Sequence, residues 1–217
     1  MQGAQMTQLV DLTVQGFTAA LASDAPAPGG GSSAAAAGAA GAALLGMVAR
    51  LTVGKEKYRT AWEEMGTVAH HADDIRKRLL ELVDEDTRAF DAIVAARKLP
   101  KETPDQKAAR LKAIDAATLL ATTVPMQTAS FAVKALSLAP TAAEKGNPNA
   151  ASDAFVGALL LAAAVEGALA NVRINLPGIS DEAMSVGFRQ DAEDLAKRMA
   201  EAMVEVRKTA KARGLTE

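Results

Sequence analysis

Apolar side chains recur at steps of three and four residues along most of the chain. This spacing places them on one face of an α-helix, so each stretch predicts an amphipathic helix that buries that face. The stretches cover about residues 7–23, 33–51, 59–98, 104–136, 148–172 and 180–213. No linker or internal repeat divides the 217 residues, so we expect an all-α fold, with residues 1–217 forming a single-domain bundle of about six helices. The fifth stretch is very apolar and is expected at the centre.

The breaks between these stretches carry residues that start helices. The sequence Thr-Pro-Asp-Gln at 103–106 predicts a capping box with proline at the first helical position. Ser32 or Ser33 can cap the second helix. That helix also holds three glycines, Gly38, Gly41 and Gly46. A glycine weakens a helix by about 1 kcal/mol relative to alanine, so we expect another helix or a ligand to approach closely there.

Composition narrows the class of protein. Hydrophobic residues make up 49% and aromatic residues only 3%, and the chain is rich in alanine, the strongest helix former. The absence of cysteine excludes disulfides, thiolate metal sites and cysteine nucleophiles, and fits a reducing, cytoplasmic location. A net charge of −2, with one Trp and one Tyr, argues against nucleic acid as a partner.

Neither a membrane nor a metal is expected as a partner. The first 14 residues contain Asp11 and lack the basic and apolar regions of a signal peptide. The most apolar stretch, residues 154–170, reaches the lower length limit of a membrane span, but Glu166 interrupts it and Asp153 precedes it. We therefore interpret it as a core helix. The two histidines are adjacent and face different directions on a helix, which makes them a poor metal pair.

One charged residue interrupts an apolar face. Asp86 lies four residues after Leu82 and four before Phe90, so it should face the core with them. Burying a carboxylate is unfavourable unless it is paired or protonated. Asp86 is therefore either a catalytic residue or a member of a buried structural pair, and the sequence leaves both open.

A second group of polar residues lies at the two ends of the most apolar helix. Asn147, Asn149 and Asp153 surround its first turn, where the helix dipole stabilises anions. They are candidate site residues, or else Asn147 and Asp153 simply cap the helix. At the far end, Arg173 could pair with a buried carboxylate or hold a carboxylate of a substrate.

Two further segments hold candidate chemistry. Residues 29–32, Gly-Gly-Gly-Ser, lead straight into the second helix, whose free backbone N–H groups form a candidate anion site. The segment is not a P-loop, because no Lys-Ser or Lys-Thr pair follows the final glycine. Lys55 and the only tyrosine, Tyr58, are three residues apart, which puts them on one face if the segment is helical.

Seven segments occur in register over about residues 6–210. They are Pro28 to Ser32, Leu51 to Tyr58, Asp84 to Phe90, Leu99 to Lys101, Glu144 to Asn149, Ser152 to Ala154 and Asn171 to Leu176. In this order they resemble the cyclodeaminase/cyclohydrolase family. That family includes the cyclodeaminase part of formiminotransferase-cyclodeaminase and stand-alone bacterial methenyltetrahydrofolate cyclohydrolases.

The resemblance implies an all-helical homodimer that acts on a one-carbon unit held at N5 and N10 of tetrahydrofolate, with no metal or redox cofactor. Asp86 and Asp153 would act as general acid and base, if burial raises their pKa values toward neutrality. Lys55 and Tyr58 would polarise the reacting nitrogen or oxygen. The implied substrate-binding residues are Gly29, Gly30, Gly31, Ser32, Asn147, Asn149, Arg173 and Lys145. Of these, Arg173 or Lys145 would hold the glutamate tail of the folate.

Two reactions fit the resemblance. A cyclohydrolase adds water to the amidinium carbon of 5,10-methenyltetrahydrofolate and gives 10-formyltetrahydrofolate. A cyclodeaminase lets N10 attack the N5 formimino carbon, and ammonia leaves. A chain of this length has no room for the transferase domain commonly fused to the deaminase, so we expect the cyclohydrolase, with formiminotetrahydrofolate cyclodeaminase as the alternative. A noncatalytic helical dimerisation module would explain the alanine packing but would leave Asp86 and Asp153 without a purpose.

Overall fold

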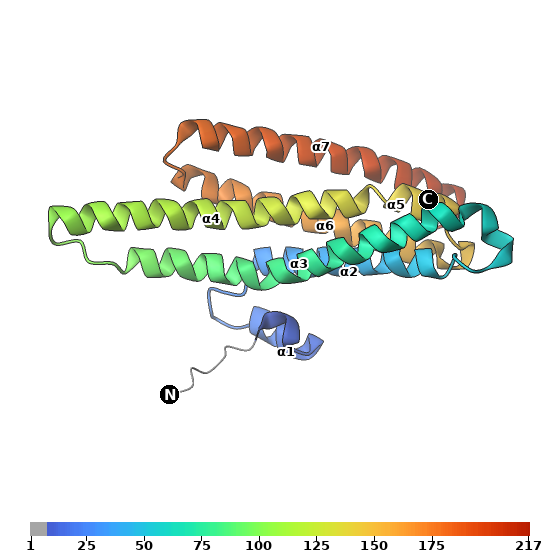
Figure 1. Ribbon diagram of the computed structural model, residues 1–217, viewed down its shortest axis with the longest axis horizontal. Helices are drawn as coiled ribbons and strands as arrows, with labels where there is room; N and C mark the ends of the chain where they lie inside the picture. Colours follow the sequence, from blue (N-terminus) through green and yellow to red (C-terminus); the bar gives the residue numbers. More distant parts are fainter. Residues whose placement is uncertain (1–7) are drawn as a thin grey trace.

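The computed structural model describes residues 8–217 and confirms the all-α fold (Figure 1). The long helices of the bundle are α2 (Gly30–Arg50), α3 (Trp62–Arg97), α4 (Pro104–Leu136), α6 (Ala151–Asn175) and α7 (Glu182–Ala212). The shorter helices are α1 (Val14–Leu21) and α5 (Ala139–Lys145), and 3-10 turns lie at Leu9–Asp11, Glu56–Ala61, Pro148–Ala150 and Leu176–Gly178. Each of the six predicted stretches contains a helix. The helix that the sequence pattern missed is α5, which begins at Ala139 and has Pro140 in its first turn.

The predicted helix starts are right at α4 and wrong at α2. The Thr103 hydroxyl oxygen accepts the backbone N–H of Gln106 at 3.2 Å, and the Gln106 side chain accepts the N–H of Thr103 at 3.2 Å, which completes the capping box. Neither Ser32 nor Ser33 caps α2, because the helix begins directly after Gly29. Both serines lie inside its first turn, which frees the Ser32 hydroxyl to contact α3.

Glycines let α2 and α6 pack closely at the middle of the bundle. A methyl group on Gly41 would lie 2.7 Å from the carbonyl oxygen of Gly157, and one on Gly157 would lie 3.0 Å from the oxygen of Gly41. A methyl group on Gly38 would lie 3.2 Å from Ala164. The close approach of another helix predicted at Gly38 and Gly41 is therefore confirmed, whereas Gly46 has only an ordinary contact with Ala72 of α3 at 3.5 Å.

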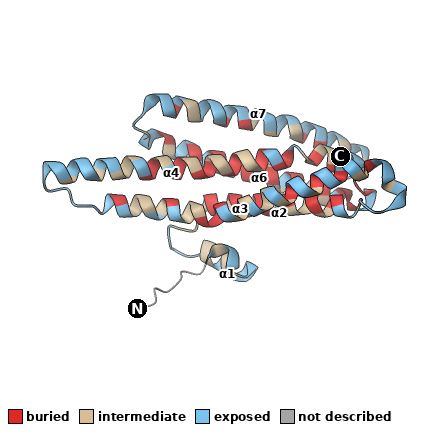
Figure 2. Cartoon of the chain, viewed as in Figure 1, coloured by how far each residue is buried: buried red, intermediate tan, exposed pale blue. Residues whose placement is uncertain are grey.

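One face of this central pair is not covered. By length and composition alone, α2 and α6 are apolar enough to cross a membrane, but only 44% of the most apolar window of α6 is buried in the bundle. Val156 and Leu159 of α6 are 45% and 37% exposed. The exposed positions of α6 between residues 151 and 170, called here the α6 stripe, are Ser152, Val156, Leu159, Ala163, Glu166 and Ala170. Elsewhere the buried positions face inward between the helices (Figure 2).

Helix α1 lies outside the bundle, below α2 and α3 in the view of Figure 1. The buried carboxylate of Asp84 accepts the backbone N–H of Leu9 at 2.6 Å. Leu9 and Phe17 pack against a core cluster that includes Leu79 and Leu82. These contacts hold the segment that leads into α2.

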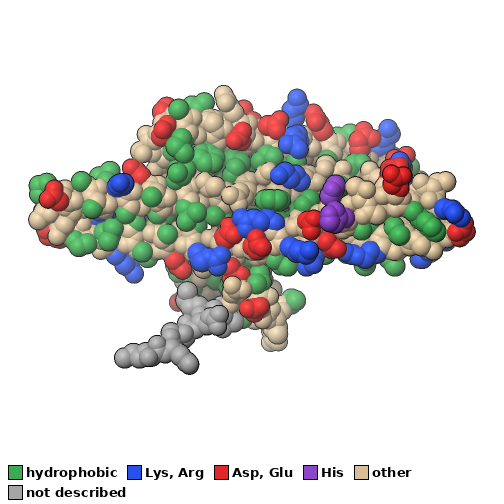
Figure 3. All heavy atoms as spheres, viewed as in Figure 1, with side chains coloured by type: hydrophobic (Ala, Val, Ile, Leu, Met, Phe, Trp, Pro, Cys, Tyr) green, Lys and Arg blue, Asp and Glu red, His purple; other side chains and the backbone are tan. Residues whose placement is uncertain are grey.

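Charged side chains gather on the outer face of α3 (Figure 3). Arg78 pairs with Glu85 at 2.6 Å and also donates to the side-chain oxygen of Gln127 on α4 at 2.6 Å. The guanidinium holds the pKa of the Glu85 carboxyl below its usual range. This network joins α3 to α4 and leaves the inner face of α3 for the site described next.

Candidate active site

Asp86 lies on the inner face of α3, where the register with Leu82 and Phe90 predicts it. Burial raises the pKa of its carboxyl, and hydrogen bonds from Ser32 act in the opposite direction. The Ser32 hydroxyl lies 3.0 Å from Oδ2. Gly31 packs directly against the carboxylate, so that a methyl group at this position would overlap Oδ1. The first turn of α2 therefore holds Asp86 in place.

Ser32 has more hydrogen-bond partners than protons. Its buried Oγ lies 2.9 Å from the carbonyl oxygen of Val83, 3.0 Å from Oδ2 of Asp86 and 3.2 Å from Oγ1 of Thr87. When Asp86 is ionised, Ser32 can donate its single proton to the carboxylate. When Asp86 is protonated, the acid can donate to Ser32, which then donates to Val83. Ser32 can therefore hydrogen-bond to Asp86 in either protonation state.

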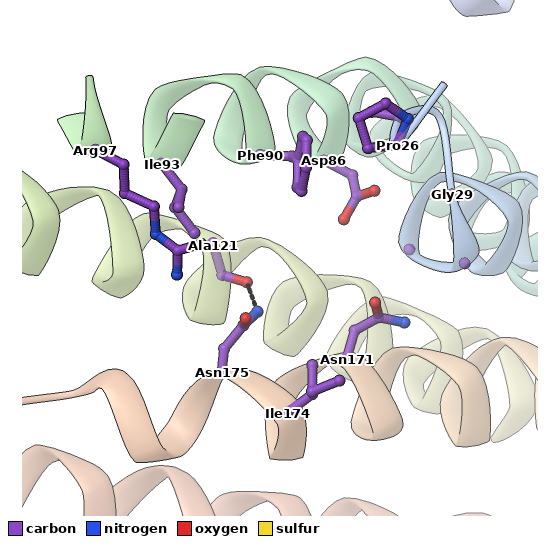
Figure 4. Close-up of a pocket in the computed structure, with 13 residues that line it drawn as sticks. Pro26, Gly29, Asp86, Phe90, Ile93, Arg97, Ala121, Asn171, Ile174 and Asn175 are labelled. Atoms are coloured by element: carbon purple, nitrogen blue, oxygen red, sulfur yellow. Dashed lines mark hydrogen bonds between the residues drawn. The ribbon is translucent and has the colours of Figure 1, made fainter. Parts of the chain in front are cut away.

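Asp86 opens onto a pocket of about 430 Å³ at the N-terminal end of α2 (Figure 4). Its side chains come from three helices: Phe90, Ile93 and Arg97 from α3, Ala121 from α4, and Asn171, Ile174 and Asn175 from α6. Pro26, Ala27 and the three glycines at 29–31 complete the lining. In Figure 4 the Asp86 carboxylate and the Asn171 amide point into the space between α3 and α6. Apolar walls with a few convergent polar groups are typical of a small-molecule site.

A proline in α4 shapes one side of this pocket. Pro125 has no N–H, so the carbonyl group of Ala121, four residues earlier, lacks its usual helical donor. The side-chain amide of Asn175 donates to that oxygen at 2.8 Å (Figure 4). This bond ties the end of α6 to α4 and positions the pocket wall.

A second cluster forms at the opposite end of α2. The Tyr58 hydroxyl donates to Oδ1 of Asn147 at 2.9 Å, and the same oxygen accepts the N–H of Asn149 at 3.1 Å. Asn147 is buried, and its backbone N–H donates to Oγ1 of Thr52 at 2.8 Å. Its side-chain amide donates to the carbonyl oxygen of Leu51 at 3.3 Å. Asn147 thus caps the turn before α6, as predicted, and also fastens that turn to α2.

Three other predicted residues lie near this second cluster. Asp153 is half-buried in the first turn of α6, and the cap position belongs to Ala150. The cap interpretation of Asp153 is therefore wrong, and its role as a general acid or base stays a prediction. Lys145 is exposed and pairs with Glu64 at 2.6 Å. Lys55 is exposed at the start of the 3-10 turn that follows α2.

Arg173 is oriented toward a different surface. It is exposed and lines a groove between α6 and α7 together with Leu176, Pro177, Arg189, Ala192 and Glu193. It is absent from the lining of the Asp86 pocket. The structure therefore does not bring it together with Asp86.

Within one chain most of the predicted site residues, but neither Arg173 nor Lys145, fall into two separate groups. We call them the Asp86 half-site, with Gly29, Gly30, Gly31 and Ser32, and the Tyr58 half-site, with Lys55, Asn147, Asn149 and Asp153. They lie at opposite ends of α2, whose 21 residues rise 1.5 Å each, so the half-sites are about 30 Å apart. Arg97 is a pocket residue that was not among the candidates predicted from the sequence. Its signal is the spacing of eleven residues from Asp86, about three helical turns, which keeps both on one face.

Fold and site define an all-helical protein with a small-molecule pocket built around a carboxylate whose pKa is raised. The sequence model of the formiminotransferase-cyclodeaminase family matches residues 13–194. The chain belongs to this family.

Similar proteins of known sequence or structure carry three enzyme names. The methenyltetrahydrofolate cyclohydrolase of Methylorubrum extorquens is 37% identical over 84% of this chain and 88% of its own length. The formimidoyltransferase-cyclodeaminase of Gallus gallus is 35% identical over 92% of this chain, which spans only 36% of that protein. The crystal structure of formiminotetrahydrofolate cyclodeaminase from Thermotoga maritima superimposes with a TM-score of 0.85 at 27% identity, covering 94% of this chain and 98% of that one.

Proposed function

We propose that this protein hydrolyses 5,10-methenyltetrahydrofolate to 10-formyltetrahydrofolate, without a metal or redox cofactor. The observation that carries the proposal is the Asp86 carboxyl, which is partly buried, lies 3.0 Å from the Ser32 hydroxyl and is open to a pocket. The 37% identity to a cyclohydrolase over most of both chains supports the choice of reaction. We further propose a cytoplasmic location and no nucleic-acid or membrane partner, in line with the composition.

Asp86 can serve both proton transfers of this reaction. As the water oxygen bonds to the amidinium carbon, the ionised carboxylate takes a proton from the water. The adduct then breaks its bond from carbon to N5, and Asp86 returns the proton to N5. The hydroxyl proton of the adduct leaves to solvent as the formyl C=O forms on N10. Burial raises the pKa of Asp86 and so brings it closer to neutral pH. A carboxyl with a pKa nearer to neutrality can both accept and release a proton during the reaction, which favours this exchange.

Cyclodeamination of 5-formiminotetrahydrofolate is the second candidate. The structural likeness to the Thermotoga maritima cyclodeaminase over 98% of that chain favours it. In that reaction N10 attacks the formimino carbon, and the amino group leaves as ammonia once it has been protonated. The same acid and base would serve, so the two reactions differ in the leaving group rather than in the machinery.

Incubation of the purified protein with each substrate tests these assignments. We expect methenyltetrahydrofolate to be consumed, and Asp86→Asn to lower kcat by about 100-fold or more. Asp91→Asn, an exposed carboxylate on the same helix, is the matched control and should keep full activity. Ammonia release from formiminotetrahydrofolate without hydrolysis would favour the second candidate. If the protein accelerates neither reaction, the enzyme proposal is contradicted, and a noncatalytic helical dimerisation module is the interpretation that remains.

We also propose that two copies form a homodimer through the open face of α2 and α6. The α6 stripe is mostly apolar, and beside it α2 shows half-exposed or exposed Ala37, Ala40, Leu44 and Met47. Helical geometry places both sets on the same side of the α2–α6 pair. An apolar surface of this kind is typical of a protein–protein interface.

A two-fold axis that lies in this face, perpendicular to α6, would bring the two half-sites of different copies together. In such a dimer the two α6 helices run antiparallel, so the start of one lies beside the end of the other. Asp153 and Asn171 are eighteen residues apart, five turns of α6, and therefore lie on the same side of that helix. The Tyr58 half-site of one copy would then approach the Asp86 half-site of its partner. The roles of Asp153, Tyr58, Lys55, Asn147 and Asn149 in catalysis or binding depend on this arrangement.

Mixing two inactive variants tests the shared site. We expect Asp86→Asn and Asp153→Asn each to be inactive alone, and co-refolded mixtures to regain about a quarter of the wild-type activity, because half of the dimers then hold one intact site. Co-refolded Asp86→Asn and Asp86→Ala, two inactivating changes at the same residue, are the matched control and should stay inactive. If the mixture of Asp86→Asn and Asp153→Asn regains no activity, or if light scattering shows a monomer, the shared site is contradicted while the proposed reaction stands.

A further inference from the structure

One face of α3 carries four different pocket residues in a fixed order. Asp86, Phe90, Ile93 and Arg97 are spaced by four, three and four residues, which keeps them on one helical stripe, and all four line the same pocket. The rise of the helix separates the two ends of this stripe by about 16 Å. The stripe therefore has a carboxylate at one end, an apolar middle and a guanidinium at the other end.

The guanidinium of Arg97 is available to a ligand. Among the hydrogen bonds and ion pairs of residues 8–217, none involves this side chain. Its backbone, in contrast, is fixed: the carbonyl oxygen of Arg97 accepts hydrogen bonds from Nε and Nη2 of Arg110 at 3.3 and 3.1 Å. In Figure 4 the side chain reaches from the end of α3 toward Ala121 and Asn175. Together with Asp86, it supplies the formal charges of the pocket lining.

The order of groups along the stripe matches the order of groups in a folate. A folate has the reacting one-carbon unit at the pterin, then a benzoyl ring, then a glutamate with two carboxylates. The carboxylates lie roughly 10 Å from the reacting carbon, by ordinary covalent bond lengths. An extended arginine side chain spans the remaining distance to the end of α3.

We propose that Arg97 binds a glutamate carboxylate of the folate substrate, with the benzoyl ring against Phe90 and Ile93 and the one-carbon unit at Asp86. This assignment rests on the proposed function. It replaces Arg173 and Lys145, which the sequence favoured for the tail: Arg173 faces the α6–α7 groove, and Lys145 is paired with Glu64. A guanidinium binds a carboxylate through two parallel N–H donors, which gives it orientation as well as charge.

A pair of substrates that differ only in the glutamate tests the assignment. Wild-type protein, Arg97→Ala and the exposed control Arg173→Ala are assayed with methenyltetrahydrofolate and with methenyltetrahydropteroate, which lacks glutamate. We expect Arg97→Ala to raise KM for the first substrate by about tenfold to a hundredfold with kcat nearly unchanged, and to leave KM for the second unchanged. Arg173→Ala should change neither. Equal effects of Arg97→Ala on both substrates, or no effect on either, would overturn the assignment.

Binding without turnover separates this inference from the proposed reaction. Calorimetry with 5-formyltetrahydrofolate and 5-formyltetrahydropteroate measures the same difference in Kd, whether or not the protein hydrolyses the methenyl compound. A wild-type preference for the glutamate form that Arg97→Ala abolishes supports the assignment even if hydrolysis is absent. A preference that survives in Arg97→Ala refutes it even if hydrolysis is observed.

Discussion

Gly31 of α2 and Asp86 of α3 share one small volume, because the carboxylate occupies the place that a side chain at position 31 would fill. The glycine therefore sets how closely the carboxylate approaches the first turn of α2. That contact, together with the Ser32 hydroxyl, defines the position of the proposed acid and base.

Gly31→Ala should impair the site while the bundle remains folded. The added methyl group overlaps Oδ1 and must displace Asp86 or α2, so we expect kcat/KM to fall at least about tenfold, since small misplacements of a catalytic group reduce rates strongly. Gly66→Ala is the matched control, because no atom lies within 4 Å of the added methyl group. That variant should keep its activity and gain up to about 1 kcal/mol in unfolding free energy. Full activity of Gly31→Ala in steady-state kinetics would contradict this geometry.

Ser32→Ala should move the pH dependence of activity. The hydrogen bonds from Ser32 lower the pKa of Asp86, so loss of the hydroxyl raises that pKa further. If ionised Asp86 is the base, the rising limb of kcat/KM against pH shifts to higher pH. Ser33→Ala removes the neighbouring hydroxyl, which bonds only to the carbonyl oxygen of Gly29 at 2.9 Å, and should leave the profile unchanged. An unshifted profile in Ser32→Ala would separate Asp86 from the observed titration.

Asp86 should also make stability depend on pH. Because burial raises its pKa in the folded protein, the folded state binds the proton more tightly than the unfolded chain does. This tighter proton binding stabilises the folded state fully when the pH is below the pKa of Asp86 in the unfolded chain. The stabilisation is lost as the pH rises through the pKa of Asp86 in the folded protein. Asp86→Asn has no such dependence, so its melting temperature should rise relative to that of the wild type over this window. If the melting temperatures of Asp86→Asn and the wild type change with pH in the same way between pH 4 and 8, the Asp86 carboxyl is not desolvated.

Asn175 should stabilise the fold by compensating for Pro125. Asn175→Ala leaves the Ala121 carbonyl oxygen without a donor, and we expect a loss of about 1–2 kcal/mol in unfolding free energy by denaturant titration. Pro125→Ala restores the backbone N–H that can bond to the same oxygen. In that background, Asn175→Ala should lower the unfolding free energy less. Equal losses in both backgrounds would show that the bond from Asn175 does not depend on the proline.

The sequence by itself determined the helices and the chemistry of the candidate residues. The three- and four-residue spacing of apolar positions gave the bundle because each helix must bury one face, and the glycines of α2 gave its close contact with α6. The same periodicity placed Asp86 on an inner face. Helix starts were less certain, since Ser32 has capping potential in isolation but finds better partners in Val83 and Asp86.

Only the tertiary structure decided which candidates meet. A helix keeps residues in register along its face, but the distance between two helix ends depends on the packing of the chain. For that reason Asp86 and Tyr58, which are predicted to act on the same substrate, lie near opposite ends of α2 within one chain. Arg173 likewise faces the groove beside α7 instead of the pocket. Arg97 became a candidate for the same reason: α3, α4 and α6 converge around the surface where its side chain lies.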